Sequence, residues 1–226
     1  MMLTAMSRGE GGPVLRPTRI LDIGCGNGAQ TIFLAQHTDG SILAVDNHQP
    51  FLGELQRRAT AAGVSGKIQI SLRDMRTLEK DEGPFDLIWS EGAIFILGFR
   101  EGLAAWHSLL APGGGLAVSE MAWLRSDPPG ECRRFFAEVH PAMTGVDAHL
   151  NAIETCGYEI IGHFTEPEPA WWELYYPLEE RLRSLRKRYA SDAERLSVIE
   201  AIQAEIDIYR KYSACYGNVF YLMRRR

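Results

Sequence analysis

The sequence predicts an α/β protein built on a mostly parallel sheet with helices on both faces. Short apolar runs recur along the first half of the chain, and their starts lie about 17 to 30 residues apart. Each gap is long enough for a crossover helix, as parallel strands require. The runs are continuously apolar rather than alternating, which is typical of strands buried on both faces. They comprise residues 20–23, 42–45, 68–70, 85–89 and 115–118.

The segments between and after these runs predict the remaining elements in order. Helices are expected over 30–36 after a glycine-rich turn, over 51–62 between Pro50 and Gly63, and over 146–156 before Gly157. A further helix is expected over 101–110, where apolar residues share one helical face. Two further strands are expected at 158–161 and 218–223, separated by a stretch too long for a loop. Core spacing within that stretch predicts helices over 179–189 and 192–212, so we expect a helical insertion at about 166–217. Residues 1–18 lack periodicity and are interpreted as a loose lead-in.

Composition narrows the class of protein. With 46% hydrophobic and 23% charged residues among 226, the chain has the composition of a globular domain rather than a disordered one. Its formal charge of −5 argues against a nucleic-acid partner, which usually requires a basic surface. The 4 cysteines and 6 histidines show no metal-ligand spacing, so no metal is expected. No signal peptide or membrane span is recognisable, and we therefore expect a cytoplasmic protein.

The first strand runs into a glycine-rich turn that points to a nucleotide-like ligand. Gly24, Gly26 and Gly28 follow the strand and precede a helix, so a ligand could approach the free N–H groups at the start of that helix. Asp22 lies within the end of the strand, where a carboxylate is costly unless it organises the turn or meets a cation. Asp46 ends the next strand, where an acidic side chain can accept hydrogen bonds from ribose hydroxyls.

Several motifs in order resemble those of class I S-adenosylmethionine-dependent methyltransferases. They are ILDIGCGNG, AVDN, Arg73-Asp74-Met75, FDLIWSEG and LLAPGGGLAVSE, and they cover residues 19 to 121. FDLIWSEGAIFILGF and the WW…YY segment are further similar to uncharacterised bacterial small-molecule methyltransferases. The resemblance implies a Rossmann-like seven-stranded sheet whose last strand is antiparallel. It assigns residues 19–226 to one methyltransferase domain.

The resemblance also implies residue roles, with S-adenosyl-L-methionine as the cofactor. Asp46 would accept the ribose hydroxyls, with Asn47 beside it, and Asp74 would contact the adenine amino group. Ser90 and Glu91, at the end of the fourth strand, would border the sulfonium and the substrate. The remaining cofactor-binding residues implied are Asp22, Gly24, Cys25 and Gly26 at the methionine end, and Met75 near the adenine ring.

Candidates for the acceptor side are less sharply indicated. Glu91, after the fourth strand, is the first candidate for substrate contact or proton acceptance, and Glu120, after the fifth, is the second. Trp123, Trp171 and Tyr175 would line the substrate pocket, although a stripe at helical spacing also suits the core of the insertion. Each carboxylate has a plainer interpretation as a capping or solvated group.

The expected function is methyl transfer to a small-molecule acceptor by in-line displacement. Two alternatives remain at this point: a catalytically inactive scaffold that binds S-adenosylmethionine, and, more remotely, an NAD-dependent oxidoreductase. Exposed aromatic surface on the insertion would favour a homodimer. Members of the resembled class usually carry more residues before the first strand, so the cover of the acceptor pocket would have to come from the insertion, a second subunit or further residues.

Overall fold

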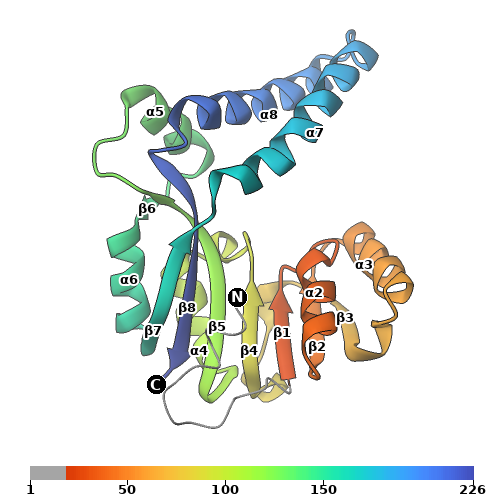
Figure 1. The fold of residues 1–226 in the computed structure, drawn as a ribbon, viewed down its shortest axis with the longest axis vertical. Coiled ribbons are helices and arrows are strands. Elements are labelled where there is room, and N and C mark those ends of the chain that lie inside the picture. The colour runs from red at the N-terminus through yellow and green to blue at the C-terminus, as the bar shows by residue number, and fades with distance from the viewer. Residues whose placement is uncertain (1–18) are drawn as a thin grey trace. The chain divides into compact units, whose positions relative to one another are not determined.

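The structure, a computed structural model, describes residues 19–226 (Figure 1). The chain folds into two compact units. The first unit contains the described residues up to 120 together with 147–164 and 220–226, and the second contains 121–146 and 165–219. The expected lead-in over residues 1–18 lies outside the described residues.

The sheet contains the seven strands expected from the sequence, in the order β3-β2-β1-β4-β5-β8-β7. Pairing is parallel from β3 through β2, β1 and β4 to β5. A short strand, β6, which the sequence did not predict, pairs with the end of β5. The strands are β1 (Arg19–Ile23), β2 (Ser41–Asp46), β3 (Ile68–Leu72), β4 (Phe85–Ser90), β5 (Leu110–Trp123), β6 (Thr144–Gly145), β7 (Tyr158–Thr165) and β8 (Tyr216–Arg225).

The last strand is antiparallel, as expected, and lies between β5 and β7 (Figure 1). Near the start of β8, the carbonyl of Asn218 accepts a hydrogen bond from the backbone N–H of Glu166, just beyond the end of β7. Past its other end, the N–H of Arg226 donates to the carbonyl of Gly157, just before β7 begins. The two strands therefore run in opposite directions, and the predicted fold class is confirmed.

Helices cover both faces of the sheet because alternate strand residues point to opposite sides. On one face, Ile20, Ala44 and Leu87 join a core cluster with residues of the two helices after β1 and β2. On the other face, the hydroxyl of Tyr221 is bonded to the His149 ring of the helix before β7. The helices of the first unit are α2 (Ala29–His37), α3 (Gln49–Ala61), α4 (Phe99–His107) and α6 (Val146–Thr155), with short 3₁₀ turns η1 (Ser65–Lys67), η2 (Met75–Thr77), η3 (Lys80–Glu82) and η4 (Ile94–Ile96).

One helix boundary differs from the sequence prediction. We expected a helix over 101–110, but α4 ends at His107 and Leu110 already belongs to β5. The carbonyl of Leu109 accepts the N–H of Phe85, and Leu110 pairs with Phe85 in the sheet. Strand pairing with a distant segment therefore overrides the local helical pattern of the leucines.

The second unit is mainly helical and includes the predicted insertion between the last two strands. Its helices are α5 (Gly130–Val139), α7 (Glu168–Arg188) and α8 (Ala193–Tyr212). Helix α5 was not predicted, and α7 begins well before the expected start at residue 179, continuing through Pro177. Buried Tyr175 and Leu182 lie on either side of this proline and pack into one core, which explains why the helix is not interrupted there.

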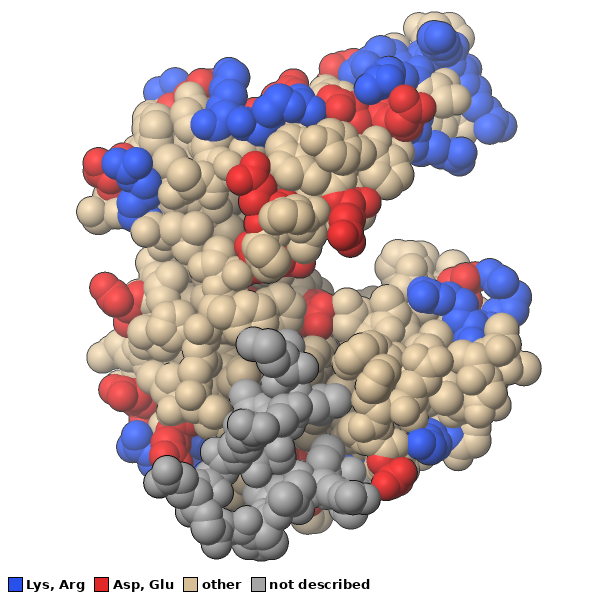
Figure 2. Space-filling model, in the orientation of Figure 1, with Lys and Arg blue, Asp and Glu red and all other residues tan. Residues whose placement is uncertain are grey.

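Charge on the α7–α8 pair is mixed rather than uniformly basic. Figure 2 shows Lys and Arg side chains interspersed with Asp and Glu over these two helices on the visible face. Arg186 of α7 pairs with Glu200 of α8, and Arg183 pairs with Glu180 within α7. These contacts are typical of a solvated helix surface.

Candidate functional site

The glycine-rich turn after β1 has backbone geometry that side chains would disturb. Gly24, Gly26 and Gly28 all have positive φ angles, of 72°, 54° and 81°. A Cβ built on Gly24 would lie 2.5 Å from the Cβ of Ala93, and one on Gly28 would overlap the side chain of Leu55. Glycine at these two positions therefore allows the close approach of the β4 loop and of α3 to the turn.

Backbone hydrogen bonds attach this turn to the end of β2. The N–H groups of Gly24 and Cys25 both donate to the carbonyl of Val45, at 2.8 and 3.1 Å. The carboxylate of Asp46 accepts from the N–H of Gly26 at 2.9 Å and from the N–H of His48 at 2.8 Å. Asp46 is thus held by one donor on each oxygen and remains partly exposed.

Asp22 lies beneath the turn and is 2% exposed. It accepts a hydrogen bond from the Thr31 hydroxyl of α2 at 2.5 Å. Burial raises the pKa of Asp22 to about 7, against the lowering effect of the Thr31 bond, and the charge of Asp46 raises it further. Burial also raises the pKa of the Cys25 thiol, with Asp22 and Asp46 adding to the effect, so this thiol is protonated at neutral pH.

The loop after β3 brings Asp74 and Met75 to the same edge of the sheet as Asp46. Asp74 caps η2 by accepting from the backbone N–H of Arg76 at 2.8 Å and also pairs with the Arg76 guanidinium at 3.1 Å. The first of these bonds is the main cause that lowers the pKa of Asp74. Arg76 donates in addition to the carbonyl of Ile96 at 3.0 Å, and so links the loops that follow β3 and β4.

These loops enclose a cavity of about 280 Å³ at the carboxyl ends of β1, β2, β3 and β4. Of the predicted cofactor-binding residues, the structure brings Gly24, Gly26, Asp46, Asn47, Asp74 and Met75 together in its lining. Asp22, Cys25 and Ser90 do not line it. The other lining residues are Val45, His48, Phe51, Arg73, Gly92, Ala93 and Ile96.

Sequence reasoning did not select several of these lining residues. Phe51 and Ile96 are exposed at 48% and 42%, and the rings of Phe51 and His48 meet edge to face at 4.3 Å. An apolar residue in the first turn of a helix that follows Asp46 was the available signal for Phe51. Nothing near Ile96 in the sequence indicated that it would line the cavity, because it lies in η4, a turn that follows β4.

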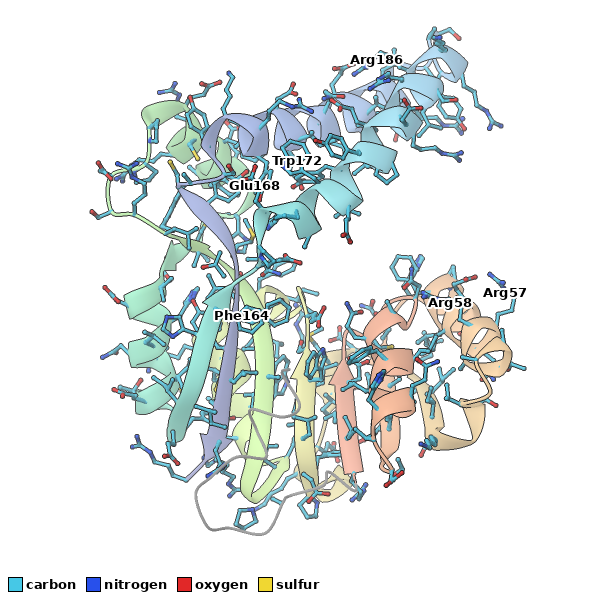
Figure 3. All side chains as sticks on the ribbon, viewed as in Figure 1. Arg57, Arg58, Phe164, Glu168, Trp172 and Arg186 are labelled. Atoms are coloured by element: carbon cyan, nitrogen blue, oxygen red, sulfur yellow. The ribbon has the colours of Figure 1, made fainter. Side chains whose placement is uncertain are left out.

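A further contact steadies the turn from outside the cavity. The Arg58 guanidinium of α3, labelled in Figure 3, donates to the backbone carbonyl and the side-chain oxygen of Asn27 at 3.1 and 3.0 Å. Neither residue was selected from the sequence.

At the end of β4, Ser90 and Glu91 have different environments. Ser90 is fully buried and its hydroxyl donates to the carbonyl of Ile23 at 3.0 Å, so it joins the ends of β4 and β1. Glu91 is half-buried and accepts from the Gln30 amide at 2.6 Å and from the Trp89 indole N–H at 3.0 Å. Glu120, on β5, is 5% exposed.

The three predicted substrate-pocket residues belong to the second unit and pack in its core. Tyr175 is 2% exposed and donates to Glu205 at 2.8 Å, while the Trp171 ring stacks on Tyr209 at 4.5 Å. The Trp123 ring meets Phe136 edge to face at 5.4 Å. These contacts favour the interpretation of the aromatic residues at helical spacing as the core of the insertion. The role of the three residues in substrate binding stays a prediction.

Trp172 of α7 is partly buried against the same core and has a polar partner. The indole N–H of Trp172 donates to Glu168 at 3.0 Å, and both are labelled in Figure 3.

Residues 19–226 contain neither a candidate metal centre nor a candidate membrane-spanning helix. No group of three or more His, Cys, Asp or Glu side chains in this part of the chain is arranged to hold a metal ion. Within the same range, every helix is too short or too polar to cross a membrane.

Comparison with known proteins agrees with this geometry. Residues 20–114 match the family model described as a methyltransferase domain. The chain is 26% identical over 213 residues to 27-O-demethylrifamycin SV methyltransferase of Amycolatopsis mediterranei, covering 88% of this chain and 72% of that protein. It is 25% identical over 179 residues to sterol 24-C-methyltransferase of Saccharomyces cerevisiae, with 73% of this chain and 45% of the yeast enzyme covered, so it spans less than half of that relative.

Among solved structures, an S-adenosylmethionine-dependent methyltransferase from Geobacter sulfurreducens, crystallised with S-adenosyl-L-homocysteine, has the same fold. It superposes with a TM-score of 0.82 at 19% identity, covering 100% of this chain and 89% of that one.

The fold and the cavity at the strand ends define an α/β enzyme of the kind that binds a nucleoside cofactor at its glycine turn. Together with the match of residues 20–114 to a methyltransferase domain, they support an S-adenosylmethionine-dependent methyltransferase of class I. The residues present fit the cofactor of that class. The turn is open where Gly26 lines the cavity, Asp46 offers carboxylate oxygens, and Phe51, Met75 and Ile96 offer apolar surface.

Proposed function

We propose that this protein binds S-adenosylmethionine in the cavity beside the glycine turn and transfers its methyl group to a small-molecule acceptor. The observation that carries the proposal is the convergence of Gly24, Gly26, Asp46 and Met75, from the ends of three strands, on one cavity. Open α/β sheets bind nucleoside ligands at this edge.

The proposed roles follow from the hydrogen-bond acceptors and the apolar surface that each side chain presents to the cavity. Asp46 accepts one backbone N–H on each oxygen and has lone pairs left for two ribose hydroxyls. Met75, Phe51 and Ile96 provide apolar contacts for a flat base. Asp74 would receive the adenine amino group in addition to its bonds from Arg76.

The methyl group on the cationic sulfur supplies a reactive centre with a good leaving group. The chain's own contribution is then to hold the donor and the acceptor in line and to exclude water. Glu91 and Glu120 are the candidate proton acceptors, and either is needed only where the acceptor atom loses a proton. Glu91 suits contact with the substrate because its carboxylate is half-buried and fixed by two donors.

The relatives support a small molecule as the acceptor. The rifamycin and sterol enzymes named above are methyltransferases of small molecules, one for an oxygen and one for a carbon position. We therefore propose the same broad class of acceptor here, without restriction to either atom.

Calorimetric titration with S-adenosylhomocysteine tests the cofactor site, with NADH as the control ligand. We expect micromolar binding of the first alone, and a loss of affinity in Asp46→Ala. Asp147→Ala removes an exposed carboxylate on α6, away from the cavity lining, and should bind normally. Tight binding of NADH would contradict the assignment, and so would normal affinity in Asp46→Ala.

A screen of small-molecule acceptors tests the transfer step. Each compound is incubated with S-adenosylmethionine carrying a labelled methyl group, and labelled product is detected by mass spectrometry. Label in a product supports the proposed activity. Firm cofactor binding without any labelled product across chemically broad compounds would instead favour a non-catalytic binding protein.

A further inference from the structure

We propose that Arg76 is a positioning residue of the cofactor site: by bonding Asp74 and the carbonyl of Ile96 at once, it fixes the carboxylate that selects ligands with an adenine amino group. This inference rests on the proposed function, because it assumes that the base of S-adenosylmethionine lies in the cavity beside Asp74. Arg76 lies outside the cavity lining, to which both of its partners belong. It therefore acts on the ligand through them.

The bridge made by Arg76 joins two loops whose strands are not neighbours. Asp74 follows β3, while Ile96 ends η4 after β4, and β2 and β1 lie between these strands in the sheet. Met75, the residue after Asp74, already reaches the turn after β1, since its Cε lies 3.7 Å from a Cβ built on Gly24. The contact between the two loops therefore reaches across the strand ends at which the cavity lies.

Each donor of Arg76 has a partner of its own. The backbone N–H donates to Oδ1 of Asp74 at 2.8 Å, and Nη1 donates to Oδ2 at 3.1 Å. Nη2 donates to the carbonyl of Ile96 at 3.0 Å. Because the guanidinium is planar, the bond to Ile96 restricts where Nη1 meets the carboxylate. Both oxygens of Asp74 are thereby held in one direction, with lone pairs left for a further donor.

A carboxylate held in this way distinguishes bases by their donors. The backbone N–H of Arg76 and, less strongly, its guanidinium lower the pKa of Asp74, so the carboxylate is charged at neutral pH. It accepts hydrogen bonds and cannot donate them. A base with an amino group at its edge therefore gains a charge-assisted bond, whereas a base with a hydrogen atom in that place gains none.

The effect of Arg76 is expected from its two-point contact rather than from its charge. The side chains of Arg76 and Asp74 are 55% and 38% exposed, and such an ion pair by itself stabilises little. The bond to Ile96 orients the guanidinium before the ligand arrives, so less freedom is lost on binding. Loss of the bridge should let the Asp74 carboxylate rotate, which weakens recognition of the amino group more than the other contacts of the ligand.

The test compares two ligands that differ in the amino group. S-adenosylhomocysteine and its analogue with a hydrogen atom in place of the adenine amino group are titrated by calorimetry, and the ratio of their dissociation constants is the readout. The wild type should prefer the first about tenfold, as one hydrogen bond to a charged group implies. Arg76→Met, which keeps most of the side-chain length but no donor, should reduce this preference about threefold.

Two further single variants separate the bridge from its charge. Arg76→Lys keeps the charge but lacks the planar pair of donors, so its ratio should stay near that of Arg76→Met. Arg57→Gln is the matched control, since it removes an exposed guanidinium of α3, labelled in Figure 3, that pairs with Glu54 of the same helix. It should leave the ratio unchanged.

A double-mutant cycle shows whether Arg76 acts through Asp74. Asp74→Ser keeps an oxygen that can cap η2 but removes the carboxylate, so its ratio should be close to one. In that background Arg76→Met should change the ratio no further, even where it alters the affinity for both ligands equally. A merely structural role of Arg76 would leave the ratio the same in both backgrounds.

The outcomes that oppose the inference are distinct from those that oppose the cofactor site. Equal losses for both ligands in Arg76→Met, a further change of ratio in the Asp74→Ser background, or full recovery in Arg76→Lys would overturn the inference. A wild type that binds both ligands equally would overturn it as well, while leaving cofactor binding intact. Failure of the wild type to bind S-adenosylhomocysteine would instead contradict the proposed function.

Discussion

Replacing glycines that share a positive φ angle but have different surroundings tests the description of the turn. Gly24 and Gly63 have φ angles of 72° and 70°. A Cβ on Gly63 would meet nothing within 4 Å, whereas a Cβ on Gly24 would lie 2.5 Å from that of Ala93. The two alanine variants therefore carry the same backbone cost and differ in one steric contact.

The expected magnitudes follow from these two terms. A left-handed backbone costs an alanine about 1–2 kcal/mol, and the reduced freedom of the unfolded chain returns roughly 0.4–1 kcal/mol. Gly63→Ala should therefore lower the free energy of unfolding by about 1 kcal/mol. Gly24→Ala adds overpacking of about 1–3 kcal/mol, for a total of about 2–4 kcal/mol, because the Ala93 Cβ cannot rotate aside.

Urea unfolding followed by circular dichroism measures both losses, and Gly26→Ala separates stability from binding. Gly26 has a φ angle of 54°, nothing within 4 Å of its Cβ position, and a place in the cavity lining. We expect its stability to resemble that of Gly63→Ala, while its affinity for S-adenosylhomocysteine falls. Equal destabilisation of Gly24→Ala and Gly63→Ala would refute the steric reasoning. Normal ligand affinity in Gly26→Ala would refute the proposal that the cofactor lies against the glycine turn.

Three other predictions follow from the same contacts. Asp46→Ala should weaken S-adenosylhomocysteine by about ten- to a hundredfold in calorimetry, since bonds to a charged group contribute about 1.5–3 kcal/mol each; a loss below about threefold would contradict the ribose role. The pKa of Asp22 is raised from 3.8 to about 7, so without ligand the native state binds more protons than the unfolded state between these pH values. Stability should therefore fall as pH rises through this window and level off above it, and Asp22→Asn should flatten the change in urea midpoint; an equally steep profile in the variant would assign it to other groups. Tyr175→Ala should cost about 3–5 kcal/mol in urea unfolding, whereas Tyr176→Ala, at a position that is 61% exposed, should cost about 1 kcal/mol; similar losses would place Tyr175 outside the core.

Much of the fold was predictable because its signals are local. Each strand of the parallel region is a short apolar run, and the crossover helices between the runs indicate that these strands are parallel. The glycine turn and Asp46 were recognisable for the same reason, since their spacing relative to two strand ends is visible in the sequence. The comparisons then confirmed the predicted class of enzyme.

The cavity lining was only partly predictable, because it also depends on loops from different strands. Arg76 illustrates the limit. Its side chain bridges Asp74 and the carbonyl of Ile96, which lie on loops after two different strands, and nothing near Arg76 in the sequence indicates this contact. The start of α7 was missed for a related reason, since Pro177 favours a break that only packing against a shared core overrides.

The sequence by itself determined the parallel α/β architecture, the antiparallel last strand through its family resemblance, and the edge of the sheet at which a cofactor would bind. These properties depend on periodicity and on the spacing of a few residues around strand ends. Only the tertiary structure decided that the carboxylate of Asp46 is bonded to the glycine turn and that Glu91 is oriented by Gln30. Those partners lie 20 and 61 residues away along the chain, and their contact depends on which strands become neighbours when the sheet forms.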